Sequence, residues 1–322
     1  MLSRLRAPDP APLPAAARPP GRIPQRTDSP FRGIVLIIAS TVFLACSDAL
    51  AKYLTRELPP IEIAWIRFAV FALIMLPTTL WPFGRDNNVL RTLRPGLQIL
   101  RGLGLTCSTL FFIWGLRYLP IAETSATAFV APMFVTCLSI VMLAEKVGIR
   151  RWLATIVGLF GVLIVIRPGT SAFQPAAIFP IVSALGWSFA LVLTRQISGV
   201  DRPATTMTYS ALVGFVVLTA LVPFVWVAPT QQQLLIAVVI GAASTAGHWI
   251  IVVAYRYADA SVLAPLAYSQ LIWVTILGLV MFGDFPDGWT LIGTAIIIAS
   301  GLYIAHRERV RRIQARAHPS GA

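Results

Sequence analysis

Long apolar stretches separated by short polar segments follow one another along the chain from Gly33 to His306. A helix that crosses a lipid bilayer needs about 20 mostly apolar residues. Ten stretches approach that length, near residues 33–53, 61–82, 97–117, 121–143, 150–168, 175–195, 204–227, 233–255, 260–282 and 287–306. The pattern therefore predicts an all-α integral membrane protein with ten transmembrane helices.

Composition supports this class. Hydrophobic residues make up 57% of the 322 residues, charged residues only 12%, and the mean hydropathy is +0.77. A soluble domain of this composition would have too little polar surface to cover its core. Residues 1–32 contain eight prolines among arginines and alanines, which predicts a disordered basic tail. The predicted loops are short and leave no room for a soluble catalytic domain.

The formal net charge of +13 follows the predicted topology. If the amino terminus is cytoplasmic, the tails and alternate loops place 20 basic residues inside and four outside. This asymmetry is the usual signature of membrane orientation. We therefore expect a multi-pass protein of the inner (cytoplasmic) membrane, with cytoplasmic termini and a second basic tail at 307–322. The charge does not require a nucleic-acid partner.

An internal repeat relates the fourth predicted span to the ninth. Residues 114–145 align with 253–284 at an offset of 139, with eight identities in 32 positions and an acid, Glu145 or Asp284, closing each copy. The copies lie five spans apart, so they cross the membrane in opposite directions. The sequence thus predicts two inverted five-helix repeats, at 33–168 and 175–306. Inverted repeats are typical of secondary transporters, which bind a small-molecule solute and work by alternating access.

The same segments resemble the EamA family of the drug/metabolite transporter superfamily. The first copy reads Leu116-Arg117-Tyr118-Leu119-Pro120, then Pro132, Glu145 and Gly158, and the second reads Tyr255-Arg256-Tyr257-Ala258, Tyr268, Asp284, Gly293 and Gly301. The second copy departs from the family pattern at Asp284, where glutamate is more usual, and at Leu271, which stands where the first copy has Pro132. The resemblance implies ten helices, cytoplasmic termini and a central solute cavity.

The resemblance also suggests substrates. Some members export amino acids and related metabolites, while others take up riboflavin or S-adenosylmethionine. The segment 47–54, followed by Glu62 and Arg67, is most similar to the uptake branches. Riboflavin-type uptake is accordingly our leading expectation. Export of amino acids or related metabolites and uptake of S-adenosylmethionine are the alternatives.

Aromatic and polar side chains within the spans are candidates for solute binding. Trp187, Tyr268 and Trp273 could stack on a flat ring system, and Gln270 could both donate and accept hydrogen bonds. His248 could contact the solute or titrate during transport. The alternative for the aromatic residues is ordinary helix packing, and for His248 a hydrogen bond to a neighbouring helix.

Three further residues are candidates for coupling or gating. Asp48 could bind a proton or a cationic group of the solute, or form an ion pair with Lys52 one turn later. Glu123 could serve as a gate or proton site, or only stabilise the start of its helix. Pro132 removes a hydrogen bond within its span and is the best hinge candidate.

An intramembrane enzyme is the remote alternative. Ser188 and His248 could be imagined as a catalytic dyad, but no third orienting group is evident. The chain has neither a His-Glu-x-x-His metal motif nor a nucleotide-binding loop. We therefore expect no enzymatic activity, no cofactor and no bound metal, and an energy source other than ATP.

Overall fold

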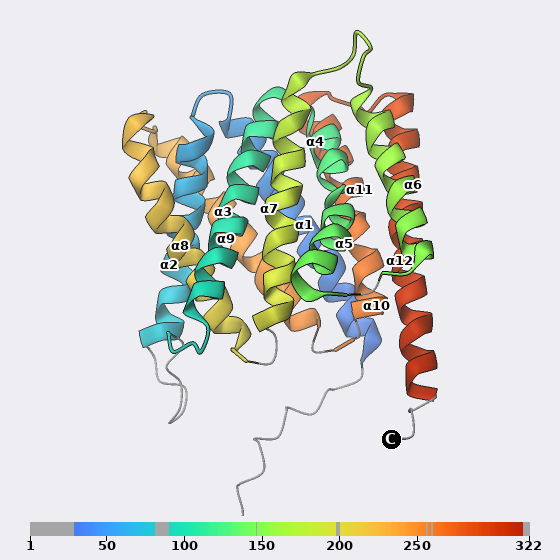
Figure 1. Cartoon of the computed structure of the whole chain (residues 1–322). Coiled ribbons are helices and arrows are strands. Elements are labelled where there is room, and N and C mark those ends of the chain that lie inside the picture. Colours follow the sequence, from blue (N-terminus) through green and yellow to red (C-terminus); the bar gives the residue numbers. More distant parts are fainter. Residues whose placement is uncertain are drawn as a thin grey trace, which may run out of the picture.

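A computed structural model describes residues 29–80, 90–145, 147–197, 200–255, 257–258 and 260–317, and these residues contain helices and no β-strand (Figure 1). The first six α-helices are α1 (Pro30–Leu54), α2 (Pro60–Leu80), α3 (Pro95–Tyr118), α4 (Ile121–Ala128), α5 (Ala131–Leu143) and α6 (Ile149–Ile166). The rest are η1 (Pro175–Ala177), α7 (Ile178–Ile197), α8 (Pro203–Leu221), η2 (Val222–Phe224), α9 (Gln231–Ala254), α10 (Ala260–Leu263), η3 (Ala264–Tyr268), α11 (Ser269–Phe282) and α12 (Gly288–Ala317). Residues 1–28 of the predicted tail lie outside the described residues.

Eight segments of the described chain are long and apolar enough to cross a membrane, so the chain is an integral membrane protein. Two shorter apolar helices, Trp152–Ile166 and Gly288–Ile304, coincide with the fifth and tenth predicted spans. The first of them is short because Arg150 and Arg151 open α6. Its 15 apolar residues rise roughly 22 Å, less than the ~30 Å hydrocarbon core of a typical bilayer.

Prolines start several helices. Pro30, Pro60, Pro95 and Pro203 each begin a helix, where the missing N–H is not needed and the fixed φ suits the first turn. The first helix therefore begins three residues before the predicted start at Gly33. At the other end of the chain, α12 continues past the predicted span and is helical to Ala317.

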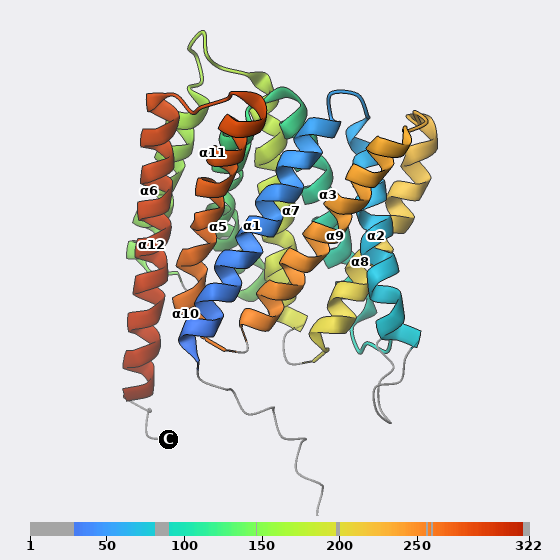
Figure 2. The ribbon, with the colours of Figure 1, turned by 180° about the vertical axis from the view of Figure 1, so that it is seen from behind.

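The most extensive helix contacts join the first half of the chain to the second. α3 packs on α7, α1 on α9, α6 on α12 and α2 on α8. In both views of the ribbon, α1 begins and α12 ends at the same end of the bundle, lowest in the pictures (Figures 1 and 2). We call this the terminal end, and the end that holds Leu54 and Tyr118 the opposite end.

Glycine pairs allow two of these contacts to be close. A Cβ on Gly104 of α3 would lie 3.0 Å from the carbonyl oxygen of Gly186 on α7, and the reverse distance is 2.8 Å. Gly161 of α6 and Gly293 of α12 face each other in the same way, at 2.8 and 2.6 Å. Small residues are what let backbones approach within a membrane, where the lipid is as apolar as the side chains.

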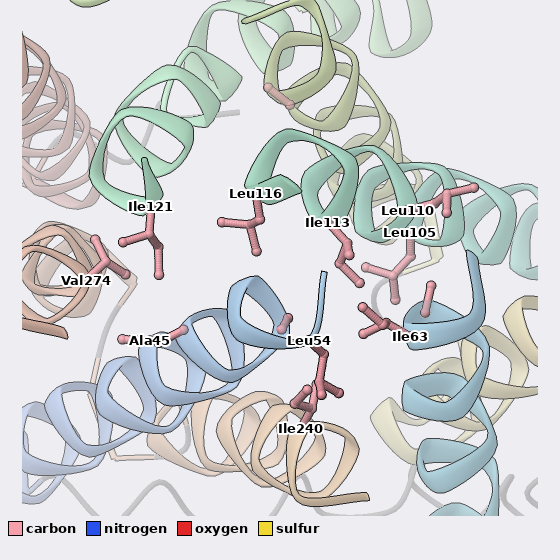
Figure 3. Close-up of a cluster of buried hydrophobic side chains, with 14 of the residues drawn as sticks. Ala45, Leu54, Ile63, Leu105, Leu110, Ile113, Leu116, Ile121, Ile240 and Val274 are labelled. Carbon is pink, nitrogen blue, oxygen red and sulfur yellow. The ribbon is translucent and has the colours of Figure 1, made fainter. Parts of the chain in front are cut away.

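A buried apolar cluster lies where α1, α2, α3, α4, α9 and α11 meet (Figure 3). Leu54 of α1 lies beside Ile240 of α9, while Ile63 of α2 faces the α3 leucines (Figure 3). Ile63 and Ile240 have no exposed surface. The cluster ties the two halves together beside the cavity described below.

Candidate functional site

A cavity of about 530 Å³ lies inside the helix bundle. Its wall is built from α2, α3, α5, α7, α8, α9, η3 and α12, so both halves of the chain contribute. A second cavity of about 290 Å³ adjoins it, because the two share wall residues that include Arg67, Trp187 and His248. Arg195, near the terminal end, lines the larger cavity, and Tyr255 lines both. Asp48 and Gln270, farther from the terminal end, line the smaller cavity.

Two interrupted helices supply part of the wall. Pro132 stands near the start of α5, and a proline ring clashes with the carbonyl four residues earlier, which is that of Ala128. α4 ends at Ala128, so the predicted fourth span is broken at 129–130. Pro265 stands in the η3 segment that interrupts the ninth span. The predicted hinge at Pro132 therefore lies beside a break one turn earlier.

The breaks bring aromatic side chains together. Phe129, at the first break, stacks on Tyr268, at the second, with ring centroids 4.9 Å apart and an interplanar angle of 28°. Both residues line the larger cavity. Tyr268 also lies against Gly301 of α12, where any Cβ would collide with the tyrosine hydroxyl. Sequence reasoning selected Tyr268 but missed Phe129 and the space that Gly301 provides.

Trp187 and His248 form a second aromatic contact in the shared wall, with ring centroids 6.2 Å apart and the rings edge to face. The Nδ1–H of His248 donates to the carbonyl of Ser244 on its own helix, at 2.8 Å. The ring is therefore held by its own helix, and not by a neighbouring helix as the alternative reading expected.

Asp48 and Gln270 meet in the smaller cavity. The Gln270 amide donates to Asp48 Oδ2 at 3.1 Å, and Arg67 Nη1 lies 3.8 Å from Asp48 Oδ1. Asp48 therefore pairs with Arg67 on α2, and not with Lys52 one turn later. Lys52 instead donates to the Leu119 carbonyl at 2.7 Å.

Two predicted site residues lie away from both cavities. Glu123, on α4 at the opposite end, interacts electrostatically with Arg167, Asp287, Lys52 and Asp284. Trp273 packs against the buried apolar cluster, and its indole N–H has no hydrogen-bond partner in the described part of the chain. The structure thus gathers Trp187, His248, Tyr268, Gln270, Asp48 and Pro132 around the cavities.

All three arginines of the cavity wall, Arg67, Arg101 and Arg195, were missed as site residues. Arg101 of α3 donates from Nε to the Thr194 hydroxyl at 2.7 Å, and Arg195 of α7 lies 3.7 Å from Glu145. Their intramembrane or near-membrane positions were visible in the sequence. The sequence did not show on which face of its helix each side chain lies.

The serine of the imagined dyad is engaged elsewhere. The Ser188 hydroxyl is bonded to the carbonyls of Ala184 and Ala131, at 2.7 and 2.9 Å. Over the described residues, no group of three or more His, Cys, Asp or Glu side chains is placed to hold a metal ion. The cavity therefore presents aromatic rings, an amide and charged side chains to a solute.

Known proteins are similar to this chain over most of its length. The S-adenosylmethionine uptake transporter of Rickettsia felis is 28% identical over 288 residues, which cover 89% of this chain and 96% of that protein. The riboflavin transporter of Vibrio cholerae serotype O1 is 30% identical over 285 residues, covering 87% and 94%. One solved crystal structure, 20% identical, has the same fold, with a TM-score of 0.59 over 85% of this chain and 98% of that one.

The sequence pattern of the EamA-like transporter family matches the chain twice, at residues 31–167 and 174–305. The two matches together span nearly all of the helical bundle. This multi-pass membrane protein belongs to the EamA-like transporter family.

Proposed function

We propose that the chain is a ten-helix secondary transporter that moves a small organic metabolite by alternating access, with 33–168 and 175–306 as inverted repeats. The helix contacts support this arrangement. With the ten spans numbered in chain order, α1 with α9 joins spans one and eight, and α3 with α7 joins spans three and six. Exchanging the repeats puts span six in the place of span one and span three in the place of span eight, so the first pair becomes the second. The α2–α8 and α6–α12 contacts join equivalent spans.

Local geometry supports the same 139-residue offset. Ala144 and Gly283, 139 apart, are both left-handed residues that end a helix, with φ of 52° and 71°. The next N–H, of Glu145 or Asp284, bonds in each copy to the carbonyl six residues back, at 3.3 and 3.1 Å. In both copies a left-handed residue ends the helix, and the chain turns back so that a carbonyl near the helix end is hydrogen-bonded. The acid that closes each copy therefore has the same backbone setting.

The terminal end is the cytoplasmic side in this proposal, in the inner membrane, because the basic residues concentrate there. The larger cavity extends toward that end. At the opposite end the two halves are tied by ion pairs, Arg167 with Asp287 at 2.6 Å and Lys52 with Asp284 at 3.9 Å. This is the pattern of an inward-facing state, with access closed on the outer side.

The solute we propose is a planar heteroaromatic metabolite. The observation that carries this is the pair of aromatic contacts in the cavity wall, Phe129 with Tyr268 and Trp187 with His248. Flat rings stack on such side chains, and Gln270 offers an amide to ring carbonyls or nitrogens. Uptake of riboflavin fits the uncharged aromatic part of the wall, and S-adenosylmethionine, named for other relatives, also carries a flat ring.

Asp48, Pro132 and Glu123 have coupling or gating roles in this proposal. Asp48 would take up a proton when the Arg67 contact opens, since an unpaired carboxylate is costly inside a membrane. Pro132 would let α5 move relative to α4. Glu123 would contribute to closure at the opposite end.

The test is solute exchange in vesicles that contain only the purified protein. Labelled riboflavin, S-adenosylmethionine, tryptophan and leucine are offered with and without a pH gradient. We expect saturable exchange of at least one planar compound, accumulation driven by the pH gradient, and loss of that accumulation but not of exchange in Asp48→Asn. Exchange of leucine alone would overturn the planar assignment in favour of amino-acid transport.

A matched pair of tryptophan variants tests the binding surface. Trp187→Ala removes a ring from the cavity wall and should weaken binding of the planar solute roughly tenfold, since an aromatic contact and its burial contribute about 1.4 kcal/mol or more. Trp114→Ala is the control, because Trp114 stacks on Phe179 at 6.0 Å outside the wall. Equal losses in the two variants would contradict the proposed site.

A further inference from the structure

Three arginines line the larger cavity, and they differ in their partners. Arg67 lies 3.8 Å from Asp48, and Arg195 lies 3.7 Å from Glu145. Arg101 pairs with no carboxylate within the described ranges. Arg101 is therefore the cavity arginine whose charge no described carboxylate neutralises.

Neutral groups from two other helices fix the Arg101 guanidinium. Its Nε donates to the Thr194 hydroxyl of α7 at 2.7 Å. Its Nη1 donates to the Ser210 hydroxyl of α8 and, at 3.4 Å, to the Thr206 carbonyl. The other terminal nitrogen, Nη2, makes no hydrogen bond to any described residue. The Nε and Nη1 donors are thus taken by neutral partners, and the two N–H donors of Nη2 are left for a ligand.

A half-buried cation inside a membrane protein that has only neutral partners is unfavourable, and an anion that reaches it gains charge-assisted hydrogen bonds. The free Nη2 donors can each give a charge-assisted hydrogen bond to an oxygen of a carboxylate or phosphate. Prior fixation by Thr194 and Ser210 lowers the ordering cost of such binding. The Arg101 guanidinium therefore has the properties of an anion-binding group.

We propose that Arg101 binds an acidic group, a carboxylate or phosphate, of the transported solute. The proposal rests on the proposed function, since it assigns a contact within the same cavity. Arg101 lies near the start of α3, at the terminal end, whereas the Asp48–Gln270 contact lies deeper. The solute would therefore lie with its acidic group toward the terminal end and its ring among the aromatic side chains.

Matched ligand pairs test this directly. Binding to the purified full chain is measured for S-adenosylmethionine against its decarboxylated analogue, flavin mononucleotide against riboflavin, and leucine against leucinamide. In at least one pair the acidic member should bind about tenfold tighter or more, as expected for a charge-assisted contact. The first and third pairs test a carboxylate, and the second tests a phosphate.

Substitutions then assign the preference to Arg101. Arg101→Gln should bring the affinity ratio of the preferred pair close to one, and Arg101→Lys should retain part of it. Arg94→Gln is the control, because Arg94 directly precedes the same helix but donates to the Gln196 carbonyl and lies outside the cavity wall. A ratio near one in the unmodified protein, or an equal loss for both members in Arg101→Gln, would overturn the proposal.

Three outcomes separate this proposal from others. Binding of riboflavin or decarboxylated S-adenosylmethionine without any acidic preference would leave the proposed function standing and remove the Arg101 assignment. Preference for leucine over leucinamide without binding of planar compounds would support the Arg101 assignment and overturn the planar solute. Phosphatidylglycerol that stabilises the unmodified protein but not Arg101→Gln, and that abolishes the ligand preference, would assign Arg101 to lipid instead.

Discussion

Asp201 joins the loop before α8 to the start of α3. Its carboxylate accepts hydrogen bonds from the Thr92 hydroxyl, from the Leu93 N–H at 3.4 Å and from the Gln98 amide at 2.8 Å. Burial opposes ionisation of this carboxyl, but the hydrogen bonds and the nearby Arg94 charge outweigh it and lower the pKa of Asp201 below its ordinary value. The ionised carboxylate therefore fastens the two halves of the chain at the terminal end.

The lowered pKa predicts how this contribution depends on pH. A carboxyl whose pKa is lower in the folded state stabilises the fold above its unfolded pKa of about 3.9, and this stabilisation is lost as the pH falls through the folded value. Asp201→Asn should therefore reduce thermal stability at pH 7, by no more than about 1 kcal/mol for a group that solvent still reaches. The difference should be constant down to about pH 5 and shrink below about pH 4. A difference that grows on acidification would contradict this account.

At the scale of elements, the α6–α12 contact depends on Gly161 and Gly293. Each would place a Cβ within 3 Å of the carbonyl oxygen of the other, so a side chain at either position forces the backbones apart. We expect Gly293→Val to destabilise the protein by about 1–3 kcal/mol, the usual range for overpacking. Unfolding in detergent measures this. Gly288→Val is the control, since no atom lies within 4 Å of a Cβ there, and equal effects would show that the contact is not the cause.

The elements themselves were largely predictable, because a bilayer leaves the backbone no alternative to helices. The break at 129–130 was less so. Pro132 marked the region, but the ring acts on the carbonyl four residues earlier, and helix ends depend on that clash rather than on hydrophobicity. The change from η3 to α11 likewise shifts the helical phase between Tyr268, which lines the cavity, and Trp273, which does not.

The site was predictable only in part. Polar and aromatic residues in the middle of spans were good candidates, and Trp187, His248, Tyr268 and Gln270 all line the cavities. Arg101 was visible as a charge within a span, but the hydrogen bonds that fix its side chain were not predictable, because its partners Thr194, Thr206 and Ser210 are more than 90 residues away in the sequence. Contacts of this kind arise from the packing of helices, and a single sequence does not encode them locally.

At the scale of the whole molecule, ion pairs between the two halves lie at both ends of the bundle. Arg167 with Asp287 is at the opposite end, and Arg195 with Glu145 is at the terminal end. Both pairs are formed in this state, and wider opening at either end requires the pair at that end to break. The strength of one pair relative to the other therefore biases the equilibrium between the two states.

Asp287→Asn should shift that equilibrium toward opening at the opposite end. The substitution removes the charge partner of Arg167, while asparagine can still accept the Thr290 N–H bond that begins α12. Losing an exposed pair of up to about 1 kcal/mol raises the population of the open minor state roughly fivefold. The measurement is the rate at which an impermeant thiol reagent, added from the opposite side, labels Ser183→Cys in a cysteine-free background. Ser183 lines the smaller cavity and is buried in this state, so its labelling reports the minor state alone.

Glu145→Gln weakens the pair at the terminal end and should not raise this rate. If both variants raised labelling equally, the pairs would be stabilising the bundle as a whole, and gating would have to be sought elsewhere.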